Sequence, residues 1–218
     1  MTPMSALLRS VNVGMPQEAA WAEIGRTSID KRPVDGPVRV GRLGLAGDEV
    51  SDTRHHGGPD QAVYAFARED LDAWAATLGR DVRDGQFGEN LTTEGIDVNE
   101  AEVGERWRIG SVVLEVASIR IPCNEFKSWM GENGYDRTAW VRRFTATNRP
   151  GPYLRVVREG VLAAGDALEV VHRPGHGITV TTMFRALTTE RSLLPELLRV
   201  DGLVDEARVA AEKYVAKL

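Results

Sequence analysis

The residue best suited to chemistry is the cysteine in the segment IRIPCNEF, residues 119 to 126, because it is the only cysteine in a chain of 218 residues. A single cysteine cannot form a disulfide within the chain, so Cys123 is either a small buried apolar side chain or an active thiol. Pro122 fits the first turn of a helix, which would place Cys123 at the positive end of the helix dipole. Arg120 adds a nearby positive charge that favours the thiolate, the form that attacks electrophiles and binds metals. Both interpretations of Cys123 stay open at this point.

A second group of polar residues lies in SDTRHHGGPDQAVYAF, residues 51 to 66, where His55 and His56 precede a Gly-Gly-Pro turn. Adjacent side chains point to opposite faces of a strand, so paired histidines are poorly spaced as metal ligands. The next histidine is His172, and a closed zinc site is therefore not expected. Taken alone, the pair is better explained by one imidazole that hydrogen-bonds the loop backbone.

Two further segments could bind an anion. GQFGENLTTEGID, residues 85 to 97, could present backbone N–H groups and the side chains of Asn90, Thr92 and Thr93. RTSIDKRPV, residues 26 to 34, contributes Lys31. Ordinary turns and solvated basic loops use the same residues, so neither segment identifies a phosphate site by itself.

The elements that must position these residues are mostly short strands separated by glycine-rich turns. A helical period appears at Leu71, Trp74, Ala75 and Leu78, which predicts a helix over 68–79 that ends at Gly79. Gly110-Ser111 suits a tight hairpin, and helical patches occur around 122–130 and 136–146. Strand-like segments occupy 5–14, 36–49, 60–67, 105–110, 112–121 and 153–173. This pattern predicts a mainly β fold with a closed, barrel-like sheet.

The composition changes at HRPGHG, residues 172 to 177, where a Pro/Gly hinge is followed by a helical pattern. We therefore expect a β domain over 1–177 and an all-α appendage of about three helices over 178–218. Thr182 and Asp201 are the residues expected to start helices there.

The overall composition narrows the functional classes. A hydrophobic content of 42% and a charged content of 27% are typical of a globular chain. The net charge of −5 argues against a large nucleic-acid interface, and no apolar run is long enough to span a membrane. The single cysteine and the absence of a signal-peptide pattern favour the cytoplasm.

Three blocks taken together are more specific than any one of them. HHGGPDQAVYAFAREDLDAW, FGENLTTEGID and VGERWRIGSVVLEVASIRIPC occur in this order. They resemble the MOSC family, the domain named for the carboxyl end of molybdenum-cofactor sulfurases. The helical tail resembles the three-helix domain of a bacterial stand-alone subgroup, whose members protect cells from N-hydroxylated bases.

This resemblance implies a MOSC-type β-barrel with a pocket for the molybdenum cofactor. Cys123 stands at the family's single cysteine, which implies that it is the protein ligand of the molybdenum and the catalytic residue. The residues expected around the pterin and its phosphate are Lys31, His56, Asn90, Thr92, Thr93 and Arg120. His56 matches the more regular of the two histidines, and Lys31 matches a lysine that family members commonly carry.

The function implied is a molybdenum-dependent oxidoreductase that reduces N-hydroxylated compounds such as hydroxylaminopurines. Electrons would come from a separate reductase, because the chain has no GxGxxG segment and no iron–sulfur cysteines. Two alternatives stay open: a sulfur carrier or transferase with a persulfide on Cys123, and a non-catalytic carrier of the cofactor. A small-molecule substrate is expected, with no nucleic acid and no membrane, and the sequence leaves the oligomeric state open.

Overall fold

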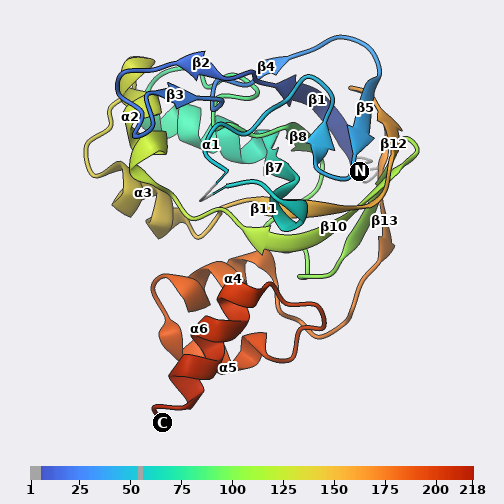
Figure 1. Ribbon diagram of the computed structural model, residues 1–218, viewed down its shortest axis with the longest axis vertical. Coiled ribbons are helices and arrows are strands. Elements are labelled where there is room, and N and C mark those ends of the chain that lie inside the picture. The colour runs from blue at the N-terminus through green and yellow to red at the C-terminus, as the bar shows by residue number, and fades with distance from the viewer. Residues whose placement is uncertain (1–5, 54–55) are drawn as a thin grey trace.

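The centre of the molecule is a strongly curved sheet of eight strands (Figure 1). The computed structural model describes residues 6–53 and 56–218. The strand order is β13-β9-β10-β11-β7-β8-β1-β4, in which only β7 and β8 are parallel neighbours. The strands of this sheet are β1 (Leu7–Val13), β4 (Arg32–Pro33), β7 (Val63–Ala67), β8 (Leu91–Glu94), β9 (Arg106–Ile109), β10 (Val112–Ile119), β11 (Pro152–Arg158) and β13 (Leu168–His172).

Two small sheets are separate from this central one. The first has the order β12 (Gly160–Leu162), β5 (Val38–Gly41) and β6 (Gly44–Leu45), and the second pairs β2 (Gln17–Glu18) with β3 (Arg26–Thr27). The predicted hairpin is confirmed, because β9 ends at Ile109, β10 begins at Val112, and Gly110 takes a positive φ of 56° between them.

The mainly β class is confirmed, but the sheet is not a closed barrel. The seam runs between β1 and residues 165–168, where Leu8 exchanges backbone hydrogen bonds with Gly165 and Asp166. A single isolated bridge joins Leu7 to Ala167. Among the described residues, the seam also has a hydrogen bond from the Leu168 N–H to the Ala6 carbonyl at 2.9 Å, and the chain turns at Gly165, whose φ is +91°.

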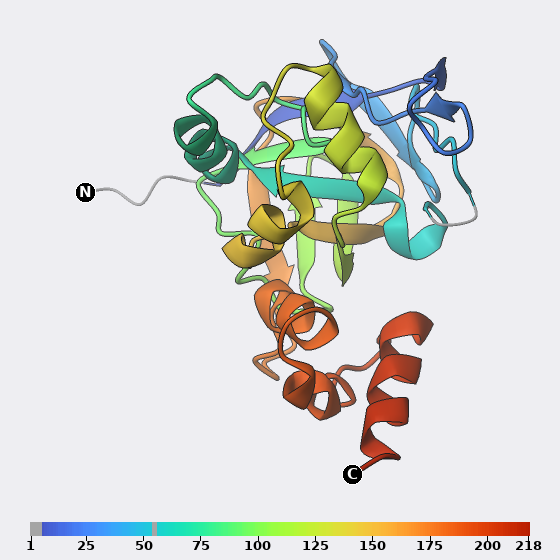
Figure 2. The same cartoon turned by 90° about the vertical axis from the view of Figure 1, so that its left-hand side faces the viewer.

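Helices α1 (Arg68–Leu78), α2 (Asn124–Glu132) and α3 (Trp140–Thr147) are joined to the sheet by a second core of aromatic side chains. In Figure 2, α2 and α3 lie in front of the strands. Phe87 packs at the centre of this cluster, with ring centroids 5.1 Å from Phe126 and 5.8 Å from Trp140. The predicted end of α1 is confirmed, because Gly79 caps it in the left-handed conformation.

The chain after the sheet is helical, and it lies below the strands in Figure 1. It comprises α4 (Val180–Leu187), η2 (Arg191–Leu193), α5 (Leu194–Leu197) and α6 (Asp205–Val215). Elsewhere in the chain, a short 3-10 helix, η1 (Pro59–Gln61), precedes β7. Val180 and Phe184 are fully buried in the same apolar cluster as the strands, so these helices share the main core. The boundary of a separate domain at residue 177 stays a prediction.

The predicted helix starts in this region were wrong. The hydroxyl of Thr179 accepts the Thr182 N–H and caps α4, so Thr182 lies inside the helix. α6 begins at Asp205 rather than at Asp201, with two acidic residues in its first turn. Within the described part of the chain, no helix combines the length and the apolar character that crossing a bilayer requires.

Candidate functional site

Cys123 lies at the start of α2, where it is the N-cap residue. Its backbone is extended, and its sulfur accepts the Phe126 N–H at 3.5 Å. Pro122 therefore precedes the helix instead of occupying its first turn, which corrects the expected register by about one position. The expected placement of Cys123 at the positive end of the helix dipole is confirmed.

The surroundings of Cys123 favour its thiolate. Burial by itself raises the pKa of this half-buried thiol, but hydrogen bonding with His56, the positive charge of Arg120 and the Phe126 N–H together lower that pKa below its usual value. A lower pKa increases the fraction of thiolate at neutral pH, and the thiolate is the soft donor for a metal and the nucleophile.

Arg120 is held rigidly beside Cys123. Its side chain is buried and donates a hydrogen bond from Nη1 to the Phe87 carbonyl oxygen. The guanidinium also lies 4.1 Å from the centroid of the Phe126 ring and 5.1 Å from that of Tyr64. A buried guanidinium at the wall of a cavity is well suited to bind an anion.

Lys31 provides a second buried cation, but its charge is already paired. The side chains of Lys31 and Asp48 form an ion pair in which they are 10% and 8% exposed. Burial lowers the pKa of Lys31, and the Asp48 carboxylate opposes that fall. The site therefore contains an internal anion as well as the expected cations.

Asn90 orients this internal anion. Its Nδ2 donates to Asp48 Oδ2 at 2.9 Å and to the Asn12 carbonyl at 3.3 Å, while its Oδ1 accepts the Tyr64 N–H at 3.1 Å. Both the nitrogen and the oxygen of the Asn90 amide thus already have hydrogen-bond partners in the protein. A ligand that binds Asn90 would have to share the amide with these partners.

These groups line one cavity of about 140 Å³. The structure brings together five of the seven predicted site residues, namely Lys31, His56, Asn90, Arg120 and Cys123. Other polar residues at the same wall are Ser28, Asp48, Glu49, Ser51, Asp52, Gln61, Tyr64, Glu125 and Tyr153. His55 lies outside the described residues.

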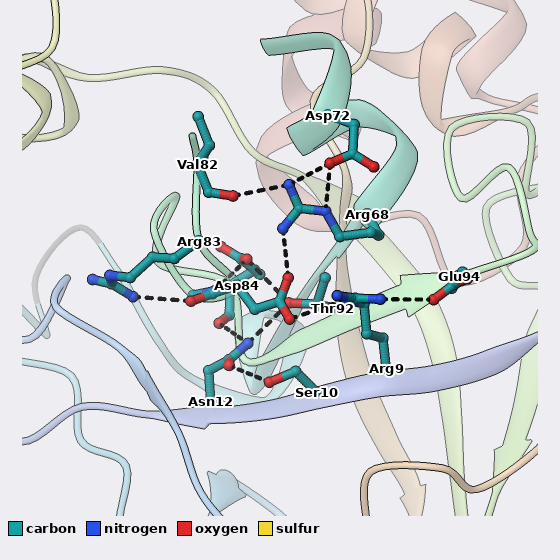
Figure 3. Close-up of polar contacts among 12 residues, drawn as sticks. Arg9, Ser10, Asn12, Arg68, Asp72, Val82, Arg83, Asp84, Thr92 and Glu94 are labelled. Carbon is teal, nitrogen blue, oxygen red and sulfur yellow. Dashed lines mark hydrogen bonds and ion pairs between the residues drawn. The ribbon is translucent and has the colours of Figure 1, made fainter. Parts of the chain in front are cut away.

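Thr92 and Thr93 are not at this wall. Both are fully buried in β8. The Thr92 hydroxyl donates to Glu89 and accepts from Asn12 at 3.1 Å, and Thr92 and Asn12 belong to the polar network drawn in Figure 3. The Thr93 hydroxyl finds no hydrogen-bond partner among the described residues. A direct contact of either threonine with a ligand is therefore not supported by this arrangement.

Asp48, Gln61 and Tyr153 are cavity residues that the sequence analysis missed. Gln61 Oε1 is a buried acceptor with no partner among the described residues, which marks a position for a ligand donor. Tyr153 reaches the cavity because β11 pairs with β7 and sets Tyr153 opposite Tyr64. Gln61 belongs to the block of residues 51 to 66 and could have been selected from it, whereas Tyr153 required knowledge of the strand pairing.

A second cavity of about 300 Å³ adjoins the first, and His56, Gln61 and Tyr153 line both. Its opposite wall comes from the C-terminal helices and the segments between them: Met183, Leu187, Arg191, Val204, Glu206, Ala207 and Ala210. The C-terminal helices therefore form part of the site, with a mainly apolar surface and two charged residues.

The donor set does not suit a bare metal ion. In the described part of the chain, His, Cys, Asp and Glu side chains form no cluster of three or more that could hold one. Cys123 offers a single soft sulfur, and Arg120 and Lys31 offer positive charge nearby. Such a set fits a metal that brings other ligands of its own together with an anionic group.

The fold and this site define a mainly β protein with a cavity lined by a cysteine, two buried cations and several carboxylates. The MOSC domain model matches residues 52–169, which is more than half of the chain, and the chain belongs to the MOSC family.

Individual relatives agree with this assignment. The chain is 33% identical over 172 residues to the uncharacterized protein YflK of Bacillus subtilis, covering 78% of this chain and 76% of YflK. It is 30% identical over 205 residues to a protein of Gibberella moniliformis named Reductase, covering 89% of this chain but only 35% of that protein. The crystal structure of YiiM from Geobacillus stearothermophilus is similar, with a TM-score of 0.78, 25% identity, and coverage of 95% of this chain and 98% of that one.

Proposed function

We propose that this chain binds a molybdenum cofactor in the first cavity and reduces N-hydroxylated compounds, such as hydroxylaminopurines, to the corresponding amines. In the balanced reaction, R–NHOH takes up two electrons and two protons, the N–O bond breaks, and R–NH₂ and water are released. The observation that carries the proposal is the position of Cys123, at a helix N-terminus in a cavity that also contains the buried Arg120 and Lys31.

Each of these residues has a distinct task in the proposal. The Cys123 thiolate would be a protein ligand of the molybdenum, because a thiolate is a soft donor that suits this metal. Arg120 and Lys31 would bind the phosphate of the cofactor, and Lys31 would then share its charge between that phosphate and Asp48. When bound, the cofactor would supply the two-electron chemistry that the protein side chains lack.

The second cavity supports a route for the substrate. It meets the first at His56, Gln61 and Tyr153, so a compound in the second cavity would approach the position of the Cys123 sulfur. Its apolar wall from α4 and α6 suits a planar base. Burial raises the pKa of Tyr153, so its hydroxyl stays protonated at neutral pH and can donate a hydrogen bond there.

A separate electron donor remains part of the proposal. The chain has no dinucleotide-binding fingerprint and no iron–sulfur cysteines. The relative named Reductase is much longer than this chain, which supports a redox setting for the domain. A reducing compartment such as the cytoplasm would keep Cys123 as a thiol.

The test is metal and pterin analysis of protein made in a cofactor-competent host, followed by turnover of a hydroxylaminopurine with a chemical reductant. The proposal expects molybdenum and pterin in nearly equal amounts, and amine as the product. Protein that contains no molybdenum in such a host would contradict the proposal. Protein that retains the cofactor but shows no turnover would favour a non-catalytic carrier.

The lowered pKa of Cys123 also favours a second candidate, a sulfur carrier with a persulfide on this residue. This candidate predicts sulfur that cyanide releases as thiocyanate from the purified protein, independent of molybdenum. A negative cyanide test on protein that contains molybdenum would exclude it.

A further inference from the structure

The turn Gly85–Gly88 is closed by the carboxyl group of Glu89, which is fully buried. Glu89 Oε1 accepts the Gly85 N–H at 2.5 Å, and Oε2 accepts the Phe87 N–H at 3.0 Å. The Thr92 hydroxyl adds a third hydrogen bond at 3.1 Å. A single carboxyl thus fixes two backbone groups of its own loop and ties them to β8.

The outer side of this turn supports two groups of the candidate site. The Phe87 carbonyl accepts the hydrogen bond from Arg120, and the Gln86 carbonyl accepts the Trp129 indole N–H at 2.7 Å. Trp129 belongs to α2, the helix that begins at Cys123. The conformation of the turn therefore determines where both the guanidinium and the helix lie.

The same turn also touches the backbone of Lys31. A Cβ on Gly85 would lie 2.4 Å from the Lys31 carbonyl oxygen, so the two backbones are in direct contact. Arg83 donates to that carbonyl at 2.6 Å. The turn is thus a common support for the two cations of the cavity and for α2.

We propose that Glu89 is a positioning residue of this site. By closing the Gly85–Gly88 turn, its carboxyl holds Arg120 and α2 where they keep the Cys123 sulfur reactive. The inference rests on the proposed function only in taking Cys123 and Arg120 as working groups of the site.

The experiment measures the rate at which iodoacetamide alkylates Cys123 at pH 7 in folded, cofactor-free protein, where the sulfur is not bound to a metal. The adduct is unambiguous because the chain has one cysteine. Glu89→Ala should slow alkylation roughly three- to tenfold, because without the carboxyl the turn would no longer hold Arg120 and the N-terminus of α2 beside the sulfur. Glu89→Gln should recover part of the rate, because the amide oxygen can still accept one backbone N–H.

A matched control is Glu105→Gln. Glu105 is also fully buried, but it accepts hydrogen bonds from Trp107 and Arg173 and lines neither cavity. This variant should lower the thermal midpoint and leave the alkylation rate unchanged. A Glu89 variant that loses stability but alkylates at the wild-type rate would overturn the proposal, since Glu89 would then be a purely structural residue.

A double-mutant cycle tests whether the effect passes through Arg120. If it does, Glu89→Gln should slow alkylation in the wild-type background but have little further effect in Arg120→Met. Equal slowing of alkylation in both backgrounds would contradict an effect that passes through Arg120. The cycle uses Glu89→Gln, so it can be carried out even if Glu89→Ala fails to fold. Because iodoacetamide needs no cofactor, a protein without molybdenum would refute the proposed function while leaving this test intact.

Discussion

Lys31 and Asp48 form a buried ion pair at the wall of the cavity that also contains Cys123. Asn90 binds the other oxygen of the Asp48 carboxylate, Oδ2, and the Gly14 N–H donates at 2.8 Å to Oδ1, the oxygen that Lys31 also binds. A phosphate that binds to Lys31 must therefore share the ammonium group with Asp48. The proposed binding of the cofactor phosphate therefore depends on Lys31 keeping its charge.

Lys31→Ala should weaken retention of the cofactor. Loss of one charged hydrogen bond to phosphate costs roughly 1.5–3 kcal/mol, which corresponds to about a ten- to hundredfold loss of affinity. The measurement is the cofactor content after gel filtration at low protein concentration. Lys213→Ala, at an exposed position on α6, is the control that should retain wild-type content.

The double variant Lys31→Ala/Asp48→Asn separates two causes of this loss. If Lys31 binds the phosphate, the double variant should remain weak. Restored retention would show that the loss came from leaving Asp48 as an uncompensated buried charge.

Gly85→Ala should destabilise the protein more than Gly79→Ala does. Both glycines have a positive φ, 77° and 63°, so both variants incur backbone strain of roughly 1 kcal/mol. A Cβ at Gly79 meets no atom within 4 Å, whereas one at Gly85 would clash with the Lys31 carbonyl. Urea unfolding of the two variants compares the costs, and equal free energies of unfolding would contradict the close contact.

The stability of the protein should depend on pH through Glu89. Burial raises the pKa of Glu89 from 4.5 to about 7. Between these values the folded state holds a proton that the unfolded state has released, so rising pH destabilises the folded state. The free energy of unfolding of the wild type, relative to Glu89→Gln, should fall by roughly 3 kcal/mol between pH 4 and pH 8.

Denaturant titrations of the two proteins over this pH range provide the measurement. A difference that stays constant with pH would show that Glu89 has the same pKa in the folded and unfolded states, which would contradict the burial argument. A free-energy difference that increases with pH would mean that folding lowers the pKa of Glu89, and it would also contradict the burial argument.

Ala210→Phe should narrow the second cavity and raise KM for the N-hydroxylated substrate, with a smaller effect on kcat. Ala210 lines this cavity but not the first, so retention of the cofactor should not change. Ala216→Phe, at the exposed end of α6, provides a control of equal size. An unchanged KM in Ala210→Phe would exclude the second cavity as the approach route.

The residues that could be predicted from the sequence are those whose partners are close along the chain. Arg120 and Cys123 are three positions apart at the junction of a strand and a helix, so local rules placed them together. The helix 68–79 was predictable for the same reason, because its apolar period and its glycine stop are local signals.

The remaining features depend on contacts between distant segments. Asp48 meets Lys31 through the fold of a glycine-rich loop, and Tyr153 reaches the cavity through the pairing of β11 with β7. Thr92 and Thr93 were expected to contact the ligand because of their hydroxyls, but the strand β8 buries both of them. The capping threonine of α4 was misplaced because Thr179 and Thr182 carry the same local signal.

The central claim is that the Cys123 sulfur is a ligand of the molybdenum, and the variant Cys123→Ser tests it most directly. The measurement is turnover of a hydroxylaminopurine per mole of folded protein, with a chemical reductant and with molybdenum content determined in parallel. We predict almost complete loss of turnover with part of the cofactor retained, because a serine oxygen is a harder donor while Lys31 and Arg120 still bind the phosphate. Turnover of Cys123→Ser at the wild-type rate would contradict the claim.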